Sequence, residues 1–134
     1  MKPAWEIVIT VAALTLQVNA LEGKTEAAKY RERMDQVQDL QYDLSDAIAQ
    51  KSSGKAIEAS ENIRALLQED LDYWIKQKID DAIGYGKSSV NYSSALAEDA
   101  KRQDFASAMA TYNKLQSTCR SCHDAHPEKR AKAN

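Results

Sequence analysis

The stretch that decides the fold is residues 105–127, "FASAMATYNKLQSTCRSCHDAHP". Asp104 stands just before it as a candidate N-cap, and Pro127 ends it because proline cannot continue a helix. Apolar residues recur along the stretch at spacings of three and four, which places them on one face of a helix. We therefore predict an amphipathic helix whose inner stripe contains Phe105, Ala108, Met109, Tyr112, Leu115, Cys119 and Cys122.

Three further helices are expected upstream. The first is predicted over residues 25–50, with Thr25 as a candidate N-cap and apolar residues at helical spacing. A turn "KSSGK" at residues 51–55, with Gly54 as its pivot, leads to a second helix over residues 55–69. The third ends near Arg102 and begins either at Trp74 or after two glycines that weaken the pattern.

Composition and length favour a small all-α domain. The 134 residues include only 4 glycines and 2 prolines, and 43% of them are hydrophobic. Helix formers dominate and chain breakers are scarce, so four amphipathic helices with short connections are expected to form an antiparallel four-helix bundle. The net charge of −2 gives no reason to expect a nucleic-acid partner.

The N-terminal segment has the composition of a targeting sequence. Lys2 precedes an apolar run over residues 7–18, and Val18-Asn19-Ala20 ends it with a pattern that a signal peptidase accepts. We predict that residues 1–20 are a cleaved signal peptide or, if they are retained, a membrane anchor. Residues 21–134 then form the bundle domain, and membrane contact is expected only if the leader is retained.

The only two cysteines form the motif "CRSCH" at the end of the last predicted helix. Cys119 and Cys122 are three residues apart and so lie on one side of the helix, with His123 about 100° further round. The two thiols suit the two vinyl groups of one haem, and the imidazole suits its iron. This spacing is the attachment pattern of a c-type haem, so we predict one covalent haem c near the C-terminus, with His123 as the proximal iron ligand.

Three other interpretations of the motif are open. A zinc site needs four ligands, and His126 would supply the fourth. A redox pair is a second interpretation, but thioredoxin-like pairs stand at the start of a helix rather than at its end. Two unrelated core cysteines are a third, and chance does not explain the histidine that follows them at once.

A single C-x-x-C-H motif near the C-terminus of a predicted four-helix bundle resembles the class II c-type cytochromes, which comprise the cytochrome c′ group and its low-spin relatives. The resemblance covers residues 25–126, and its specific part is "CRSCH" with the helix before it. It implies that a residue early in the first helix faces the iron opposite His123. In the low-spin relatives this residue is methionine, and Met34 falls close to that place. A leucine-like residue there leaves the iron five-coordinate, and Val37 is the alternative.

The resemblance also implies a helix-one arginine near the haem, for which Arg31 is the candidate and Arg33 the neighbour. Guanidinium groups pair well with carboxylates such as haem propionates. The predicted function is single-electron transport in the periplasm by a protein that is not an enzyme, with redox proteins as partners and a homodimer as an expectation. Two alternatives are a five-coordinate haem protein that binds NO or CO and a haem subunit of a membrane-anchored complex.

Overall fold

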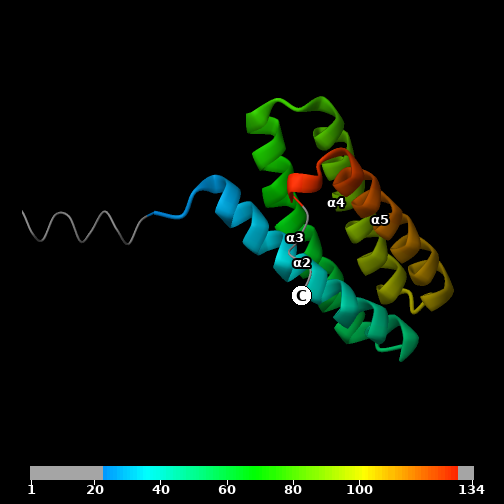
Figure 1. Ribbon diagram of the computed structural model, residues 1–134. Coiled ribbons are helices and arrows are strands. Elements are labelled where there is room, and N and C mark those ends of the chain that lie inside the picture. The colour runs from blue at the N-terminus through cyan, green and yellow to red at the C-terminus, as the bar shows by residue number, and fades with distance from the viewer. Residues whose placement is uncertain (1–22, 130–134) are drawn as a thin grey trace, which may run out of the picture.

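The computed structural model describes residues 23–129, and these form helices without any strand (Figure 1). The predicted all-α four-helix bundle is confirmed, whereas the predicted leader, residues 1–20, lies outside the described residues. No helix within residues 23–129 has the length and apolar character needed to span a bilayer. The elements are α2 (Glu26–Ala49), α3 (Ser53–Gln77), α4 (Asp80–Lys101), α5 (Phe105–Ala125) and a short 3₁₀ turn η1 (Pro127–Lys129).

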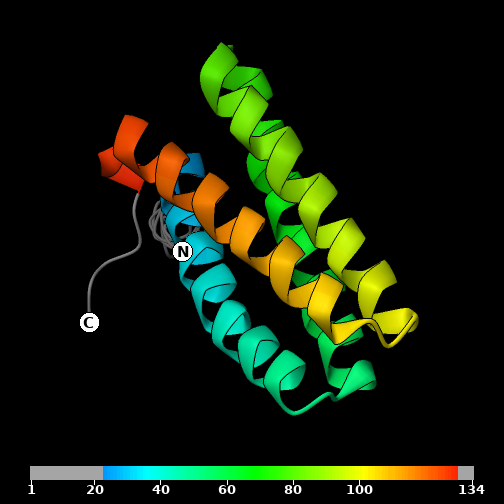
Figure 2. The ribbon, with the colours of Figure 1, turned by 90° about the vertical axis from the view of Figure 1, so that its right-hand side faces the viewer.

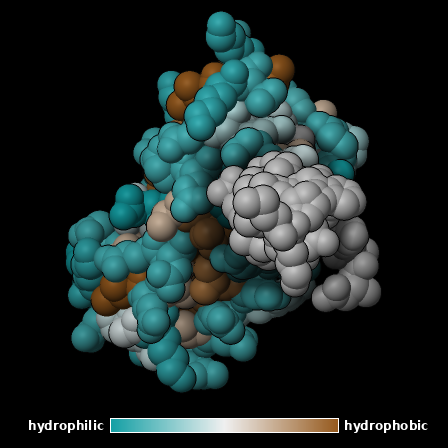
Figure 3. Space-filling model, turned by 90° about the vertical axis from the view of Figure 1, so that its left-hand side faces the viewer, coloured by the Kyte–Doolittle hydropathy of each residue, from teal (hydrophilic) through white to brown (hydrophobic). Residues whose placement is uncertain are grey.

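The four helices lie lengthwise beside one another around one core. Helix α3 packs against both α2 and α4, and α5 packs mainly against α4 and less closely against α2. Figure 2 shows the C-terminal part of α5 diverging from the α3–α4 pair. The coloured part of the face in Figure 3 is mostly hydrophilic. Over the described chain as a whole, the exposed large hydrophobic residues are Tyr42, Ile75 and Ile79.

The first and last helices begin where the sequence predicts. The Thr25 hydroxyl accepts a hydrogen bond from the Ala28 backbone N–H at 3.1 Å, and the Asp104 carboxylate accepts one from Ser107 at 3.0 Å. Each cap satisfies a backbone donor that has no partner within its helix. Because these caps are local, the sequence alone located both helix starts.

The predicted boundary between the second and third helices is wrong. Helix α3 continues past residue 69 to Gln77, and α4 begins at Asp80, so Gly84 and Gly86 lie inside it. At Gly86 an added Cβ would come within 3.0 Å of the Leu71 Cδ1 atom. This glycine therefore allows α4 to approach α3 closely, which offsets its poor helix propensity.

The three turns between helices share one geometry, and it does not use glycine. Lys51, Lys78 and Gln103 have φ angles of 54°, 56° and 56° in the left-handed region. In the first turn, the Ser52 N–H bonds the Ala47 carbonyl at 2.8 Å, and the other two turns have the same six-to-one bond. These are Schellman motifs. The prediction of a Gly54 pivot is wrong, because the left-handed residue is Lys51.

The core runs the length of the bundle. Its largest fully buried hydrophobic side chains are Leu44, Ile63, Leu96 and Leu115, with one from each helix. Met109, Tyr112 and Cys119 on the predicted inner stripe of α5 are partly buried and pack against this core. The apolar stripes of the four helices therefore meet as their periodicity predicts.

Candidate functional site

A pocket opens where α5 diverges from α3 and α4, and it collects residues that are far apart in the sequence. It encloses about 40 Å³. Three of its lining residues are Cys119, Cys122 and His123 of the motif, and a fourth is Met34 of α2. The rest come from all of the first three helices: Tyr30, Leu67, Asp70, Leu71, Trp74, Ala82, Tyr85, Gly86 and Ser89.

The motif lies in regular helix. Helix α5 continues to Ala125, so Cys119, Cys122 and His123 keep the helical spacing that brings them to one pocket. The His126 N–H caps the helix by donating to the Cys122 carbonyl at 2.8 Å. All three predicted haem-attachment residues thus line the same wall.

Both cysteines are free thiols in an environment that disfavours thiolate. Burial raises the pKa of Cys119 to about 11, and burial together with the nearby Cys119 sulfur raises the pKa of Cys122 to about 11. A side-chain amide of Gln41 donates to the Cys119 sulfur at 3.6 Å. At neutral pH the pocket therefore presents two protonated thiols beside an imidazole.

Met34 is the candidate sixth ligand, and the structure places it in the pocket. Its side chain is 8% exposed, and it lines the same cavity as His123 although 89 positions separate the two residues. Val37 is also buried, but it is not among the residues that line the pocket. Of the two helix-one candidates, Met34 is the one that shares a cavity with the motif.

Helix α4 gives the pocket a wall of small side chains. Ala82, Gly86 and Ser89 stand at i, i+4 and i+7 and so occupy one helix face toward the cavity. Helices α2 and α3 contribute large aromatic side chains, and the Trp74 indole donates a hydrogen bond to the Tyr30 hydroxyl at 3.1 Å. The small residues of α4 leave space in the pocket. The two aromatic side chains border this space, and their polar atoms are hydrogen-bonded to each other.

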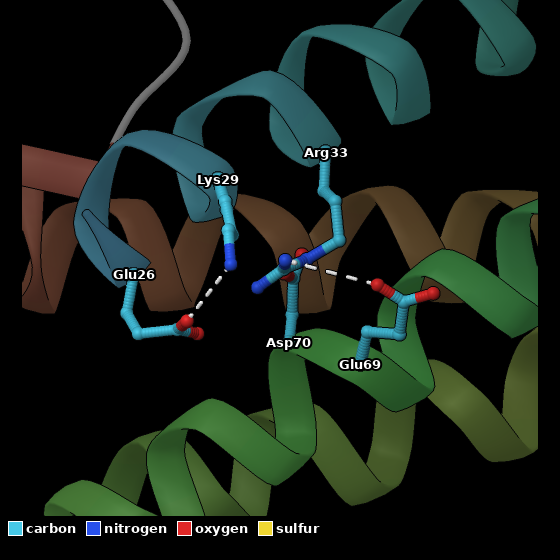
Figure 4. Close-up of polar contacts among 5 residues, drawn as sticks. All are labelled: Glu26, Lys29, Arg33, Glu69 and Asp70. Atoms are coloured by element: carbon cyan, nitrogen blue, oxygen red, sulfur yellow. Dashed lines mark hydrogen bonds and ion pairs between the residues drawn. The ribbon is translucent and has the colours of Figure 1, made fainter. Parts of the chain in front are cut away.

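The two helix-one arginines take different positions. Arg31 is exposed on α2, and it does not line the pocket. Arg33 is partly buried, donates from Nε to Asp70 on α3, and lies 3.7 Å from a Glu69 carboxylate oxygen through Nη1 (Figure 4). Arg33, rather than Arg31, is therefore the arginine that reaches a pocket residue.

His126 is held in place by contacts with residues of α3 and α4. Its ring packs on Trp74 with centroids 5.0 Å apart, and its Nε2 lies 3.0 Å from an Asp81 carboxylate oxygen. Within residues 23–129, no three His, Cys, Asp or Glu side chains gather closely enough to hold a metal ion. The four side chains of the zinc interpretation thus do not form a metal-binding group.

Sequence reasoning missed two contributors to the site, Asp70 and the α4 wall. Asp70 is buried between Leu67 and Leu71 on the inner stripe of α3. Asp70 could have been identified as a charged residue at an apolar position of a helical stripe. Charged side chains are rarely buried unless they have partners, so such a residue indicates a polar contact inside the fold. No sequence feature predicted that small residues of α4 line the pocket, because small residues at helical spacing are common on any helix.

Comparison with known proteins adds no relative to this picture. No protein-family model matches the chain, and no curated protein or solved structure is significantly similar to it.

Proposed function

We propose that this chain is a mono-haem c-type cytochrome that carries single electrons, built on an antiparallel four-helix bundle. One observation carries the proposal: Cys119, Cys122, His123 and Met34 line a single pocket. Two thiols, an imidazole and a thioether are the groups needed to attach a haem and to ligate its iron on both faces. The bundle brings the fourth of these groups from the other end of the sequence.

Each residue has a defined part in holding the group. Cys119 and Cys122 would hold the haem as thioethers, each S–H adding across one vinyl double bond so that the thiol supplies both the sulfur and the hydrogen. His123 and Met34 would ligate its iron. The haem would supply a one-electron couple, and ligation by both side chains would raise its potential and exclude small ligands.

The pocket lining suits an apolar macrocycle more than a polar substrate. Leu67, Leu71, Trp74 and Ala82 contribute apolar surface that excludes water from the group. The enclosed 40 Å³ is well below the roughly 300–1,000 Å³ of organic-ligand pockets, so α5 and the α3–α4 pair must separate to admit a haem. Loading is therefore expected to widen the bundle at this end.

The direct test is the mass and the absorption spectrum of the purified protein. The denatured chain should retain the mass of one haem, because thioethers survive unfolding, and Cys119→Ala with Cys122→Ala should abolish the retention. The reduced and oxidised spectra report the haem and its spin state together. Two free thiols accompanied by bound zinc would sink the proposal.

Met34 separates electron transport from gas binding. Met34→Leu roughly conserves volume, so the bundle should lose less than ~1.5 kcal/mol, yet the spectrum should become high-spin and the reduced form should bind CO. Met109→Leu is the matched control, because Met109 packs against the core and does not line the pocket. If the wild type is already high-spin and binds CO, the five-coordinate NO- or CO-binding protein becomes the better proposal.

Export and partners follow from the same proposal. Attachment of haem to this motif takes place outside the cytoplasmic membrane, so we place the protein in the periplasm with redox proteins as partners and a homodimer as its expected assembly. N-terminal sequencing of native protein should begin near Leu21. A sequence that begins at Met1 would favour the alternative, a haem subunit of a membrane-anchored complex.

A further inference from the structure

Asp70 is a buried carboxylate that is only half satisfied. It is 3% exposed, and its Oδ1 accepts a hydrogen bond from the Arg33 Nε, as Figure 4 shows. Its Oδ2 is buried and has no hydrogen-bond partner among residues 23–129. A buried acceptor without a partner is costly, and the cost is greater when the group is charged. Protonation of the carboxyl removes the charged part of that cost.

The unpaired carboxylate oxygen belongs to a residue that lines the pocket. Asp70 lines the cavity together with Met34 and His123, between which the iron is proposed to lie. The second buried polar atom without a partner, the Ser60 hydroxyl, belongs to a residue that does not line the pocket. Asp70 is thus the unsatisfied group that a change of charge in the pocket would affect.

Opposing influences bring the pKa of the Asp70 carboxyl close to neutral pH. Burial raises the pKa of Asp70 to about 7, although the hydrogen bond and the charge of Arg33 both lower it. The exposed Glu69 beside it raises the pKa further. From the other elements, Tyr30 of α2 is uncharged at neutral pH, Cys122 and His123 of α5 are the proposed thioether and iron ligand of the haem, and the pocket residues of α4 are Ala82, Tyr85, Gly86 and Ser89.

The sign of the coupling follows from charge alone. An oxidised haem iron carries one more positive charge than the reduced iron, and a nearby positive charge favours carboxylate. Reduction removes that charge from a pocket of low polarity, where charges are screened less than in water. The proton affinity of Asp70 must therefore be higher in the reduced protein than in the oxidised one.

We propose that Asp70 is a redox-linked proton site, which takes up one proton from solvent when the haem is reduced and releases it when the haem is oxidised. The inference rests on the proposed function. The electron comes from the redox partner, the carboxylate becomes a carboxylic acid by forming one O–H bond, and no other bond is made or broken. The protein then carries a proton together with its electron.

The test is the midpoint potential of the haem-loaded protein between pH 5 and pH 8. In the wild type the potential should fall as pH rises, with a steepest slope approaching about 59 mV per pH unit, the one-electron equivalent of a tenfold change in proton concentration. In Asp70→Asn the slope should vanish, because the amide keeps the shape but cannot titrate. Glu69→Gln is the matched control, because Glu69 is the exposed neighbour that also faces Arg33. The midpoint potential of this variant should keep its dependence on pH.

A second readout keeps the result decisive if Asp70→Asn folds poorly. Reduction of the wild type should produce the carbonyl infrared band of a protonated carboxylic acid in a redox-difference spectrum at pH 7. A flat potential without this band, in protein whose spectrum shows haem, overturns the proton site and leaves the cytochrome proposal intact. A slope that survives in Asp70→Asn also overturns it, and protein without haem overturns both.

Discussion

Two glycines on one helix provide a matched measurement of how closely α4 lies against α3. Gly84 and Gly86 stand two positions apart in α4, and an added Cβ at Gly84 meets nothing within 4 Å. At Gly86 the same atom would lie 3.0 Å from Leu71 Cδ1 and 3.4 Å from its Cβ. Alanine is therefore free to fit at the first site and crowded at the second.

The magnitudes follow from helix propensity and packing. Alanine is better than glycine inside a helix by ~1 kcal/mol, so Gly84→Ala should raise the unfolding free energy by up to that amount. Gly86→Ala gains the same propensity but must displace Leu71, and overpacking typically costs about 1–3 kcal/mol. We expect Gly86→Ala to be less stable than Gly84→Ala by at least about 1 kcal/mol.

Urea unfolding of both variants, followed by circular dichroism, measures this difference directly. Both variants are compared as the haem-free chain, because Gly86 lines the pocket and Gly84 does not, so a bound haem would affect the two variants differently. Equal stabilisation by the two substitutions would show that the α3–α4 contact is looser than the structure has it. The reasoning about Gly86 would then be refuted, together with the account of why a glycine is tolerated there.

The remaining predictions concern a buried acid, a strained turn and a buried hydrogen bond. In the haem-free chain, the unfolding free energy should fall by up to about 4 kcal/mol as pH rises from 4 to 7. The reason is that Asp70 has a pKa of about 7 when folded but near 3.8 when unfolded. Urea titrations of Asp70→Asn should show a much weaker dependence on pH. Gln103→Gly should raise the thermal midpoint by relieving a left-handed φ of 56°, worth up to about 1 kcal/mol, whereas Gln103→Ala should not. Trp74→Phe should cost about 1–3 kcal/mol by removing the indole hydrogen bond to the Tyr30 hydroxyl, and Tyr30→Phe should cost less in that background than in the wild type, as a double-mutant cycle would show.

Local signals in the sequence located the outer helices and the attachment motif. Thr25 and Asp104 cap their helices with their own side chains, so the two starts depend on a few neighbouring residues. The spacing of Cys119, Cys122 and His123 is likewise a local property of one helix. These features could be predicted because the atoms that decide them are close in the chain.

Tertiary packing decided the features that composition misjudged. Glycines suggested a break in α4 and a turn at residue 54, yet Gly86 is accommodated by close packing on Leu71, and the turns use left-handed residues such as Lys51. The helix penalty of a glycine is only about 1 kcal/mol, and it yields to the burial of a long apolar stripe. The tertiary contacts that stabilise α4 come from α3 and α5, and the local sequence does not contain them.

Some features of the pocket could be predicted from the sequence, and others depend on the tertiary structure. The sequence by itself determined one wall, the motif on α5, and it named Met34 as a residue that a bundle could bring opposite. Only the tertiary structure decided that Met34 lines that cavity while Val37 does not, and that Arg33 pairs with a buried Asp70 from another helix. The rotation of each helix about its axis sets which side chains meet, and that rotation is fixed by the packing of all four helices together.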